Sequence, residues 1–225
     1  METPAWSIEL VRGLARIHAV LRRSLETIVR VASAPVADGD RAAFAEFTER
    51  FTRFLEVHHD GEEEIIFPAV TKAAERASVD AAAASVVGFR ADHGRLLERL
   101  AALKTACSQF RSGGSAEPLR DAAIGVRDLL LPHLDAEEAT LDGALVAKLL
   151  PMNEAMEMLA AASKHGQAHG GPKVLMMLVH GLADDEQRAQ FAEIPWFVRK
   201  VLMKRVWSRD FKPCLKFAHN PTFAL

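Results

Sequence analysis

The 225-residue sequence has no tyrosine and only two cysteines. Without tyrosine, the chain cannot store a radical on a tyrosine side chain. Cys107 and Cys214 lie far apart in the sequence and form no Cys-x-x-Cys motif. This spacing excludes a disulfide framework or a thiolate zinc site as the feature that organises the fold.

Long apolar runs are also missing. No segment offers the roughly 18 consecutive uncharged apolar residues of a membrane span. Near the N-terminus, Glu9, Arg12 and Arg16 interrupt the apolar residues that a signal peptide would need. We therefore expect a cytoplasmic protein.

Several common functional signatures are absent as well. The sequence shows no glycine-rich phosphate loop, no Ser/His/Asp catalytic order and no nucleic-acid-binding motif, so nucleic acid is not an expected partner. Apolar residues make up 49% of the chain and charged residues 26%, which is ordinary for a globular protein. Charge is unevenly distributed, because residues 196–216 contain seven basic residues and one acidic residue. The chain has an acidic body and a basic C-terminal segment.

Apolar residues recur at helical spacing four times within the first 150 residues. This pattern predicts amphipathic helices at about 4–31, 40–64, 79–110 and 118–150. Pro68 is expected to bend or end the second helix, and Pro132 to kink the fourth. The prediction is an all-α, up-down-up-down four-helix bundle over residues 1–150. Residues 151–225 are predicted to form a C-terminal helical extension of unknown role.

Each predicted helix carries a histidine in the middle of its apolar stripe. On the second helix His59 and Glu63 are four residues apart, and on the fourth helix His133 and Glu137 are four apart, so each pair shares one helix face. A buried charge persists only when it is paired, hydrogen-bonded or bound to metal. Antiparallel helices of similar length can bring such groups to one level. We predict that six side chains converge: His18, His59, Glu63, His93, His133 and Glu137.

Four imidazoles and two carboxylates are more ligands than one tetrahedral zinc ion takes, and they suit two metals that share bridging carboxylates. Imidazole with carboxylate suits iron, manganese or zinc, and the sequence does not choose between them. Ferritin-like proteins use Glu-x-x-His on two helices, whereas this chain has His-x-x-x-Glu twice. The alternative is a purely structural bundle in which each histidine is a hydrogen-bonded core residue.

The register of the second helix leaves one alternative open. His58 and Glu62 lie on a second acceptable stripe, one residue out of phase with His59 and Glu63. The second His/Glu pair is interpreted as favouring His59, which leaves His58 as an outer histidine, with a ligand role as the alternative. His165 and His169 are also four apart, but the glycines around them predict a loop, so a further metal site there is not expected.

These residues resemble the hemerythrin-like HHE cation-binding family. The resemblance covers roughly residues 7–150 and rests on His18, His93, the two His-x-x-x-Glu pairs and the Glu-Glu-x-x-Phe-Pro continuation at 63–68. It implies a four-helix bundle around a non-haem di-iron centre with an oxo or hydroxo bridge. It further implies that His18 and His59 bind one iron, that His93 and His133 bind the other, and that Glu63 and Glu137 bridge them. Manganese and zinc remain alternatives to iron.

One position departs from the family pattern. Oxygen-carrying hemerythrins have a second histidine one turn before the third-helix ligand, where this chain has Phe89. One iron would then lack a protein ligand and offer an open position. This favours binding of, or reaction with, dioxygen, hydrogen peroxide or nitric oxide in a redox or oxidative-stress role, and a catalase- or oxidase-like oxidoreductase is compatible with it.

The alternative function is an iron- or oxygen-responsive sensor or binding module. Its basic segment at 196–207 would contact a protein partner or an anionic membrane surface. We favour a different interpretation of this segment, in which Trp196, Val201 and Met203 pack on the bundle while the charges stay solvated. No catalytic residue is assigned for either function.

Overall fold

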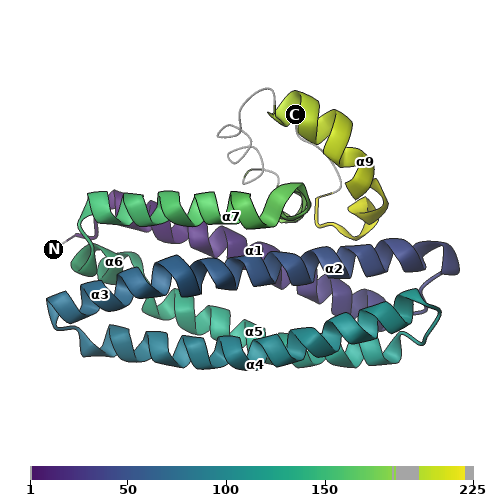
Figure 1. The fold of residues 1–225 in the computed structure, drawn as a ribbon, viewed down its shortest axis with the longest axis horizontal. Helices are drawn as coiled ribbons and strands as arrows, with labels where there is room; N and C mark the ends of the chain where they lie inside the picture. The colour runs from purple at the N-terminus through teal and green to yellow at the C-terminus, as the bar shows by residue number, and fades with distance from the viewer. Residues whose placement is uncertain (1, 184, 186–197, 221–225) are drawn as a thin grey trace.

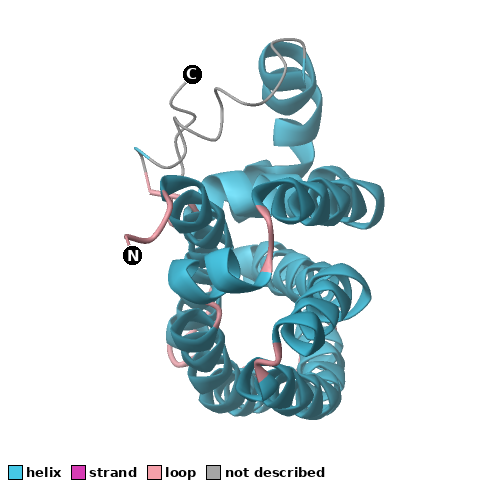
Figure 2. Cartoon of the chain, turned by 90° about the vertical axis from the view of Figure 1, so that its left-hand side faces the viewer, coloured by secondary structure: helices cyan, strands magenta, loops and turns pink. Residues whose placement is uncertain are grey.

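The computed structural model of the protein describes residues 2–183, 185 and 198–220, and all regular structure in that part of the chain is helical. Four consecutive long helices run alternately along one axis, and each contacts its neighbours in a closed ring (Figure 1). They are α1 (Ala5–Ala32), α2 (Asp38–Gly61), α4 (Asp80–Arg111) and α5 (Glu117–Thr140). Figure 2 shows this ring in a view along the bundle. The predicted four-helix bundle is confirmed.

Large apolar side chains at helical spacing hold the bundle together. Phe44 and Phe51 of α2 are fully buried, as are Leu25 and Ile28 of α1. The ring of Phe44 meets that of Phe110 from α4 edge to face, with centroids 5.8 Å apart. Burial of each such side chain stabilises the folded state by about 1.5–3 kcal/mol relative to exposure. The apolar stripes that predicted the helices are therefore the surfaces that pack.

The second predicted helix changes its winding at Glu62. After α2 ends at Gly61, a π-turn called η1 (Glu62–Ile66) leads into α3 (Phe67–Ala77). Pro68 lies in the first turn of α3, where its missing N–H leaves no hydrogen bond unmade. Glu62 and Phe67 are both buried although they are five residues apart, which matches the i to i+5 periodicity of a π-turn. The helix is interrupted where the sequence predicted, and the interruption changes which residues face inward.

The fourth predicted helix is two helices. It continues through Pro132 as α5 and ends at Thr140, and α6 (Gly143–Leu149) begins after a short break. The side chain of Asp142 accepts a 2.7 Å hydrogen bond from the backbone N–H of Leu145. This N-cap satisfies a donor that has no partner within the helix and fixes a new helix start. The prediction of one helix over 118–150 was wrong at this point.

Beyond residue 150, a long helix lies against the bundle. α7 (Met152–Gly181) packs along α1 and α2, on their side away from α4 and α5 (Figures 1 and 2). Within α7 the backbone departs from helical geometry at Gly171, with φ 59° and ψ −162°, a conformation that glycine adopts at little cost. The loop predicted around Gly166 and Gly170 was wrong, because the helix runs through both.

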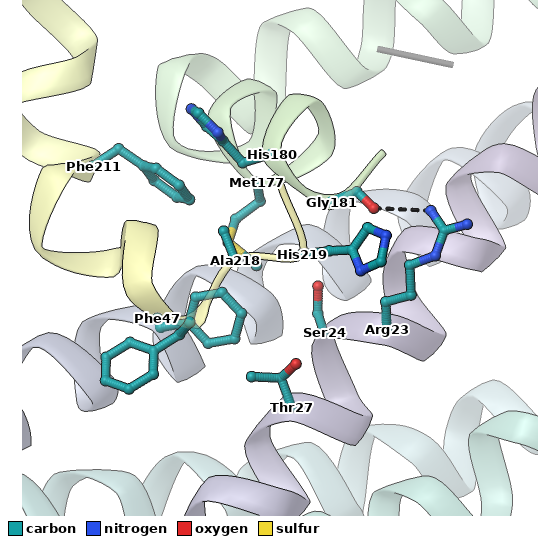
Figure 3. A pocket seen from close by; sticks show the side chains of 11 residues that line it. Arg23, Ser24, Thr27, Phe47, Met177, His180, Gly181, Phe211, Ala218 and His219 are labelled. Carbon is teal, nitrogen blue, oxygen red and sulfur yellow. Dashed lines mark hydrogen bonds between the residues drawn. The ribbon is translucent and has the colours of Figure 1, made fainter. Parts of the chain in front are cut away.

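The C-terminal segment docks on the bundle through ring contacts, and the end of α7 approaches α1 closely. It comprises η2 (Val198–Trp207), α9 (Ser208–Phe211) and η3 (Lys212–Phe217). The ring of Phe217 lies 5.2 Å from that of Phe44. Arg23 of α1 donates a 3.0 Å hydrogen bond to the carbonyl of Gly181 (Figure 3). A Cβ on Gly181 would lie 2.3 Å from Cγ1 of Val20, so only glycine allows α7 to approach α1 this closely.

Bundle and extension therefore share one apolar core, and a domain boundary at residue 150 stays a prediction. Of the basic segment, Trp196 and Phe197 and the side chains of Arg199, Lys200, Lys204 and Arg205 lie outside the described residues. Met203 is fully buried, in agreement with the interpretation that this segment packs on the bundle. A partner or membrane contact through 196–207 stays a prediction. Among the described helices, none combines the length and apolar character of a membrane span.

Candidate metal centre

Imidazole and carboxylate groups from all four bundle helices converge in the core. None of these side chains is more than 5% exposed. They are His18 of α1, His58 and His59 of α2, Glu62 of η1, His93 of α4, and His133 and Glu137 of α5. Such a concentration of buried polar groups needs either internal partners or a bound cation.

The five imidazoles form two groups. His59, His93 and His133 form the first, and their ligand atoms lie within 4.8 Å of one another. The rings of His59 and His93 stack with centroids 4.0 Å apart. His18 and His58 form the second group, with ring centroids 5.1 Å apart. Consecutive residues of α2, His58 and His59, thus belong to different groups.

Glu62 lies between the two groups. Its Oε1 is 3.3 Å from Nε2 of His58 and 4.0 Å from Nε2 of His18. Its Oε2 is 3.5 Å from Nε2 of His93, which belongs to the other group. Each oxygen of this carboxylate therefore faces a different set of imidazoles, as expected of a bridging ligand.

Glu137 has the same relation to the two groups from the opposite helix. Its Oε2 is 3.7 Å from Nε2 of His18, and its Oε1 is 3.4 Å from Nε2 of His133. The two carboxylates together connect both groups twice. These buried imidazoles and carboxylates are grouped as the ligands of a metal centre would be.

Several atoms at the centre have no hydrogen-bond partner within the described part of the chain. They are Nε2 of His18, His58 and His59, Oε2 of Glu62, and both carboxylate oxygens of Glu137. A buried polar atom without a partner costs about 1–3 kcal/mol, so such a cluster is unusual in a metal-free core. Nitrogen and carboxylate oxygen suit iron, manganese and zinc. Two nitrogens at right angles on one ion are about 3 Å apart for bonds of about 2.1 Å, and Nε2 of His93 and His133 are 3.1 Å apart. The residues fit a metal centre.

Burial controls the protonation of this cluster. It raises the pKa of Glu62 well above its ordinary value, and it raises the pKa of Glu137 to about 8. For the imidazoles burial acts in the opposite direction and lowers the pKa values of His93 and His133 to about 4. Both kinds of group are therefore held uncharged near neutral pH. A bound cation favours the carboxylate anion and leaves the imidazoles neutral, which is the state that ligands need.

Two further carboxylates lie just outside the centre and have different electrostatics. The hydrogen bond from His18 and the charge of Arg22 lower the pKa of Glu138 to about 2. Burial raises the pKa of Glu63, and the charge of Arg90 opposes that rise.

The structure brings together five of the six predicted residues: His18, His59, His93, His133 and Glu137. It places the sixth, Glu63, outside the cluster with a 35% exposed side chain. Glu62 occupies the inward position instead, and His58 is also at the centre. The predicted pairing of His59 with Glu63 therefore differs from the observed arrangement, because the π-turn begins at Glu62 and the residues after it no longer follow the stripe of α2.

A signal for this register is present in the sequence. The segment His58-His59-Asp60-Gly61-Glu62-Glu63 aligns without a gap with His133-Leu134-Asp135-Ala136-Glu137-Glu138. In this alignment His58 corresponds to His133, and Glu62 corresponds to Glu137. A position-by-position comparison of the two copies therefore identifies His58 and Glu62, the two residues that the apolar stripe did not predict.

Phe89 does not leave the centre short of imidazoles. Its ring lies 5.9 Å from that of His133 and 6.0 Å from that of Phe67, so it forms part of an apolar wall. His59 provides the third imidazole beside His93 and His133. A surface groove of about 620 Å³ opens between α4 and α5, and Phe89 and Asp92 are among the residues that line it.

α7 lies over the π-turn. Nδ1 of His165 is 3.4 Å from Oε2 of Glu64, and a Cβ on Gly61 would lie 3.5 Å from Cδ2 of the same ring. His165 and His169 are on one helix face and their rings stack with centroids 4.4 Å apart. They pack beside the centre and are not among its converging groups.

The metal-free protein is expected to lose stability as pH rises from about 7.5 to about 9. In this interval folded Glu137, with a pKa of about 8, still binds part of a proton that the unfolded chain, with a value near 4.5, has released. Burial also raises the pKa of Glu62 well above its ordinary value, so Glu62 contributes in the same direction. Stability falls with pH wherever the folded state binds more protons. Unfolded histidines, with pKa values near 6.5, have lost nearly all of their protons at pH 7.5, so the buried imidazoles oppose this loss only slightly. The expected loss from Glu137 is roughly 1 kcal/mol, at about 1.36 kcal/mol for each pKa unit.

Urea unfolding in the presence of a chelator at pH 7.5 and pH 9 measures this effect. Glu137→Gln is the control, because it removes one of the two titrating carboxyls and should reduce the dependence on pH. A wild-type stability that rises over this interval would contradict the protonation of buried Glu137.

Comparison with known protein families gives a match. The model of the hemerythrin HHE cation-binding domain matches residues 9–145, which is more than half of the chain. No curated protein and no solved structure matches the chain.

Proposed function

Because the chain belongs to the hemerythrin HHE cation-binding family, we propose that its bundle holds two iron ions and uses them to bind or transform dioxygen, hydrogen peroxide or nitric oxide. One observation carries this proposal: Glu62 and Glu137 each direct one oxygen to His18 or its neighbour His58, and the other oxygen to the second imidazole group. A single ion would not need two such carboxylates.

The residues divide between the ions as their distances suggest. His18 and His58 would hold one ion, His59, His93 and His133 would hold the other, and Glu62 and Glu137 would bridge them. Iron bound here would supply one-electron chemistry between its ferrous and ferric states. Zinc fits the same donors but has no redox chemistry, and manganese is the redox-active alternative.

The unequal numbers of imidazoles suggest where a small molecule binds. An ion held by His18 and His58 would have one imidazole fewer than its neighbour and more room for an external ligand. The sequence predicted the open position on the side of Phe89. With His59 beside His93 and His133, we propose instead that the open position is on the side of His18 and His58.

Apolar side chains enclose the centre and exclude bulk water. The ring of Phe67 stacks on that of His93 with centroids 5.3 Å apart, and Phe89 packs edge to face on His133. A low-dielectric wall strengthens the electrostatic interactions between the ions and their carboxylate ligands. It also limits entry to small molecules.

Metal analysis and optical spectra of purified protein test this proposal. We expect two iron ions per chain, an absorption band of a bridged ferric pair, and a spectral change with peroxide, dioxygen or nitric oxide. The His18→Ala protein should lose the response, because it removes a ligand from the more open ion. Iron-loaded protein that consumes no peroxide and shows no spectral change with any of the three molecules would contradict the proposed chemistry.

The contact of α7 with the π-turn favours a second candidate, a sensor in which the centre controls the C-terminal segment. His165 of α7 touches both Gly61 and Glu64, which flank Glu62 and Glu63. A change at Glu62 on metal binding would therefore reach α7 directly. Limited proteolysis of residues 151–225 with and without iron tests this candidate, and equal cleavage rates in the two states would exclude it.

A further inference from the structure

We propose that Glu63 and Glu138 are positioning residues, each of which holds a metal-facing histidine of a neighbouring helix by its Nδ1 atom and is itself held by an arginine of that helix. These two Arg–Glu–His arrangements would set how firmly the centre retains its metal and at what potential it is reduced. The inference rests on the proposed two-metal centre and adds residues that the metal ligands do not include.

The first arrangement joins α5 to α1. Oε1 of Glu138 is 2.8 Å from Nδ1 of His18. Arg22, one turn after His18 on α1, donates a 2.6 Å hydrogen bond to the same oxygen. Its second nitrogen donates at 2.6 Å to Asp135, one turn before Glu138 on α5. Arg22 therefore holds the side chain of Glu138 in position beside His18.

The second arrangement joins η1 to α4 in the same way. Oε1 of Glu63 is 2.9 Å from Nδ1 of His93. Nε of Arg90, one turn before His93 on α4, is 3.1 Å from Oε2 of Glu63. The residue that the sequence had suggested as a bridging ligand therefore contacts the far side of a histidine instead.

Both arrangements follow from one repeated sequence motif. In each His-x-x-x-Glu-Glu segment the first glutamate, Glu62 or Glu137, faces the centre. The second glutamate, Glu63 or Glu138, points to the histidine of the adjacent helix. Adjacent residues on a helix point about 100° apart. The first glutamate of each segment can therefore face the centre while the second contacts a histidine of the adjacent helix.

The arrangement determines which histidine nitrogen is available to metal. Pairing with arginine favours the ionised carboxylate, which accepts hydrogen bonds only, so Nδ1 of His18 and of His93 carries the proton and donates it. Nε2 of each ring is then left with its lone pair. These atoms face the bridging glutamates, at 3.7 Å for His18 with Glu137 and 3.5 Å for His93 with Glu62.

A negative partner on Nδ1 also makes the imidazole a stronger donor. Outer partners of this kind orient the ligand and raise its basicity, and their removal typically costs about 10–100-fold in metal affinity or activity. Stronger donors favour the ferric ion, so they lower the reduction potential of the centre. His133 has only a longer contact of this type, with Nδ1 3.5 Å from Oδ2 of Asp92.

The test uses full-length protein with Glu138→Gln, Glu63→Gln and the control Glu98→Gln, an exposed residue of α4. Glutamine keeps the size and an acceptor oxygen but removes the charge. From iron-loaded protein, a chelator should extract metal about 10–100-fold faster in the first two variants, and their reduction potentials should be higher. The control should match the wild type. Arg22→Leu should resemble Glu138→Gln more closely than Arg22→Lys does.

A second readout needs no metal. Nitrogen-15 NMR of the metal-free protein should show His18 and His93 protonated at Nδ1. Protonation at Nε2 would overturn the inference, whatever the metal content. If the wild type holds two ions but both glutamine variants release them at the wild-type rate, the inference fails while the proposed function stands. If the wild type binds no iron but both rings are protonated at Nδ1, the proposed function fails and the positioning role is supported.

Discussion

Glu62→Ala protein is expected to bind at most one metal ion per chain, whereas Glu63→Ala protein should still bind two when metal is in excess. The reason is that the adjacent residues Glu62 and Glu63 contact the histidines from different sides. Glu62 directs its oxygens to imidazoles of both groups, so its removal would deprive both proposed metal sites of a ligand. Glu63 contacts His93 from behind, and its removal weakens retention without removing a ligand.

Metal content after equilibration with excess iron and removal of unbound metal measures this prediction. Glu64→Ala is the matched control, because Glu64 is the next residue of the same π-turn and its side chain is 66% exposed. The opposite result, two ions in the Glu62→Ala protein and fewer in the Glu63→Ala protein, would restore the pairing of His59 with Glu63. Equal loss in all three variants would indicate unfolding of the turn.

Phe44→Ala is expected to lower the free energy of unfolding by about 3–5 kcal/mol, the usual cost of removing a buried phenylalanine ring. Phe44 is fully buried and lies where three parts of the chain meet. Its ring contacts Phe110 of α4 and Phe217 of the C-terminal segment. The cavity would therefore weaken both the bundle and the docking of the extension.

Urea unfolding of metal-free protein measures the loss, with Val87→Ala as the control because Val87 is 69% exposed. Surface changes of this kind usually stay within about 0.5 kcal/mol. Phe217→Ala adds a further comparison. If it leaves the unfolding free energy unchanged while Phe44→Ala lowers it, the C-terminal segment does not contribute to the stability of the bundle core.

The bundle could be predicted from the sequence because packing and periodicity have the same physical origin. Residues such as Leu25, Phe51 and Leu100 recur every three or four positions, and these are the side chains that the helices bury against one another. Five of the converging groups, His18, His59, His93, His133 and Glu137, were predicted for the same reason. They lie on regular α-helix, where the position of a residue along the chain determines the direction in which its side chain points.

The register of the second helix was less predictable because two stripes compete there. His58 and His59 both face the centre, so a rule that assigns one inward face to the helix must discard one of them. The π-turn then moves Glu63 away from the face that α-helical spacing assigns to it. No propensity scale predicts a π-turn, although two aligned copies of the His-x-x-x-Glu-Glu segment indicate its result.

Other differences arise from local backbone chemistry. Asp142 ends one helix and starts another because its side chain caps the N–H of Leu145. Around Gly166 and Gly170, contacts with α1 and α2 outweigh the low helix propensity of glycine, and only Gly171 leaves the helix. These outcomes depend on tertiary packing, which a single sequence shows only indirectly.

Consecutive histidines on α2 also give this helix a mechanical role. His58 and His59 point about 100° apart and belong to different imidazole groups, so α2 links the two groups mechanically. Any twist of α2 about its own axis would bring one imidazole forward as it withdraws the other. His165 of α7 packs near the end of α2, where a Cβ on Gly61 would lie 3.5 Å from its ring. The two imidazole groups therefore share one rotational setting of α2, and α7 packs against the end of that helix from outside the bundle.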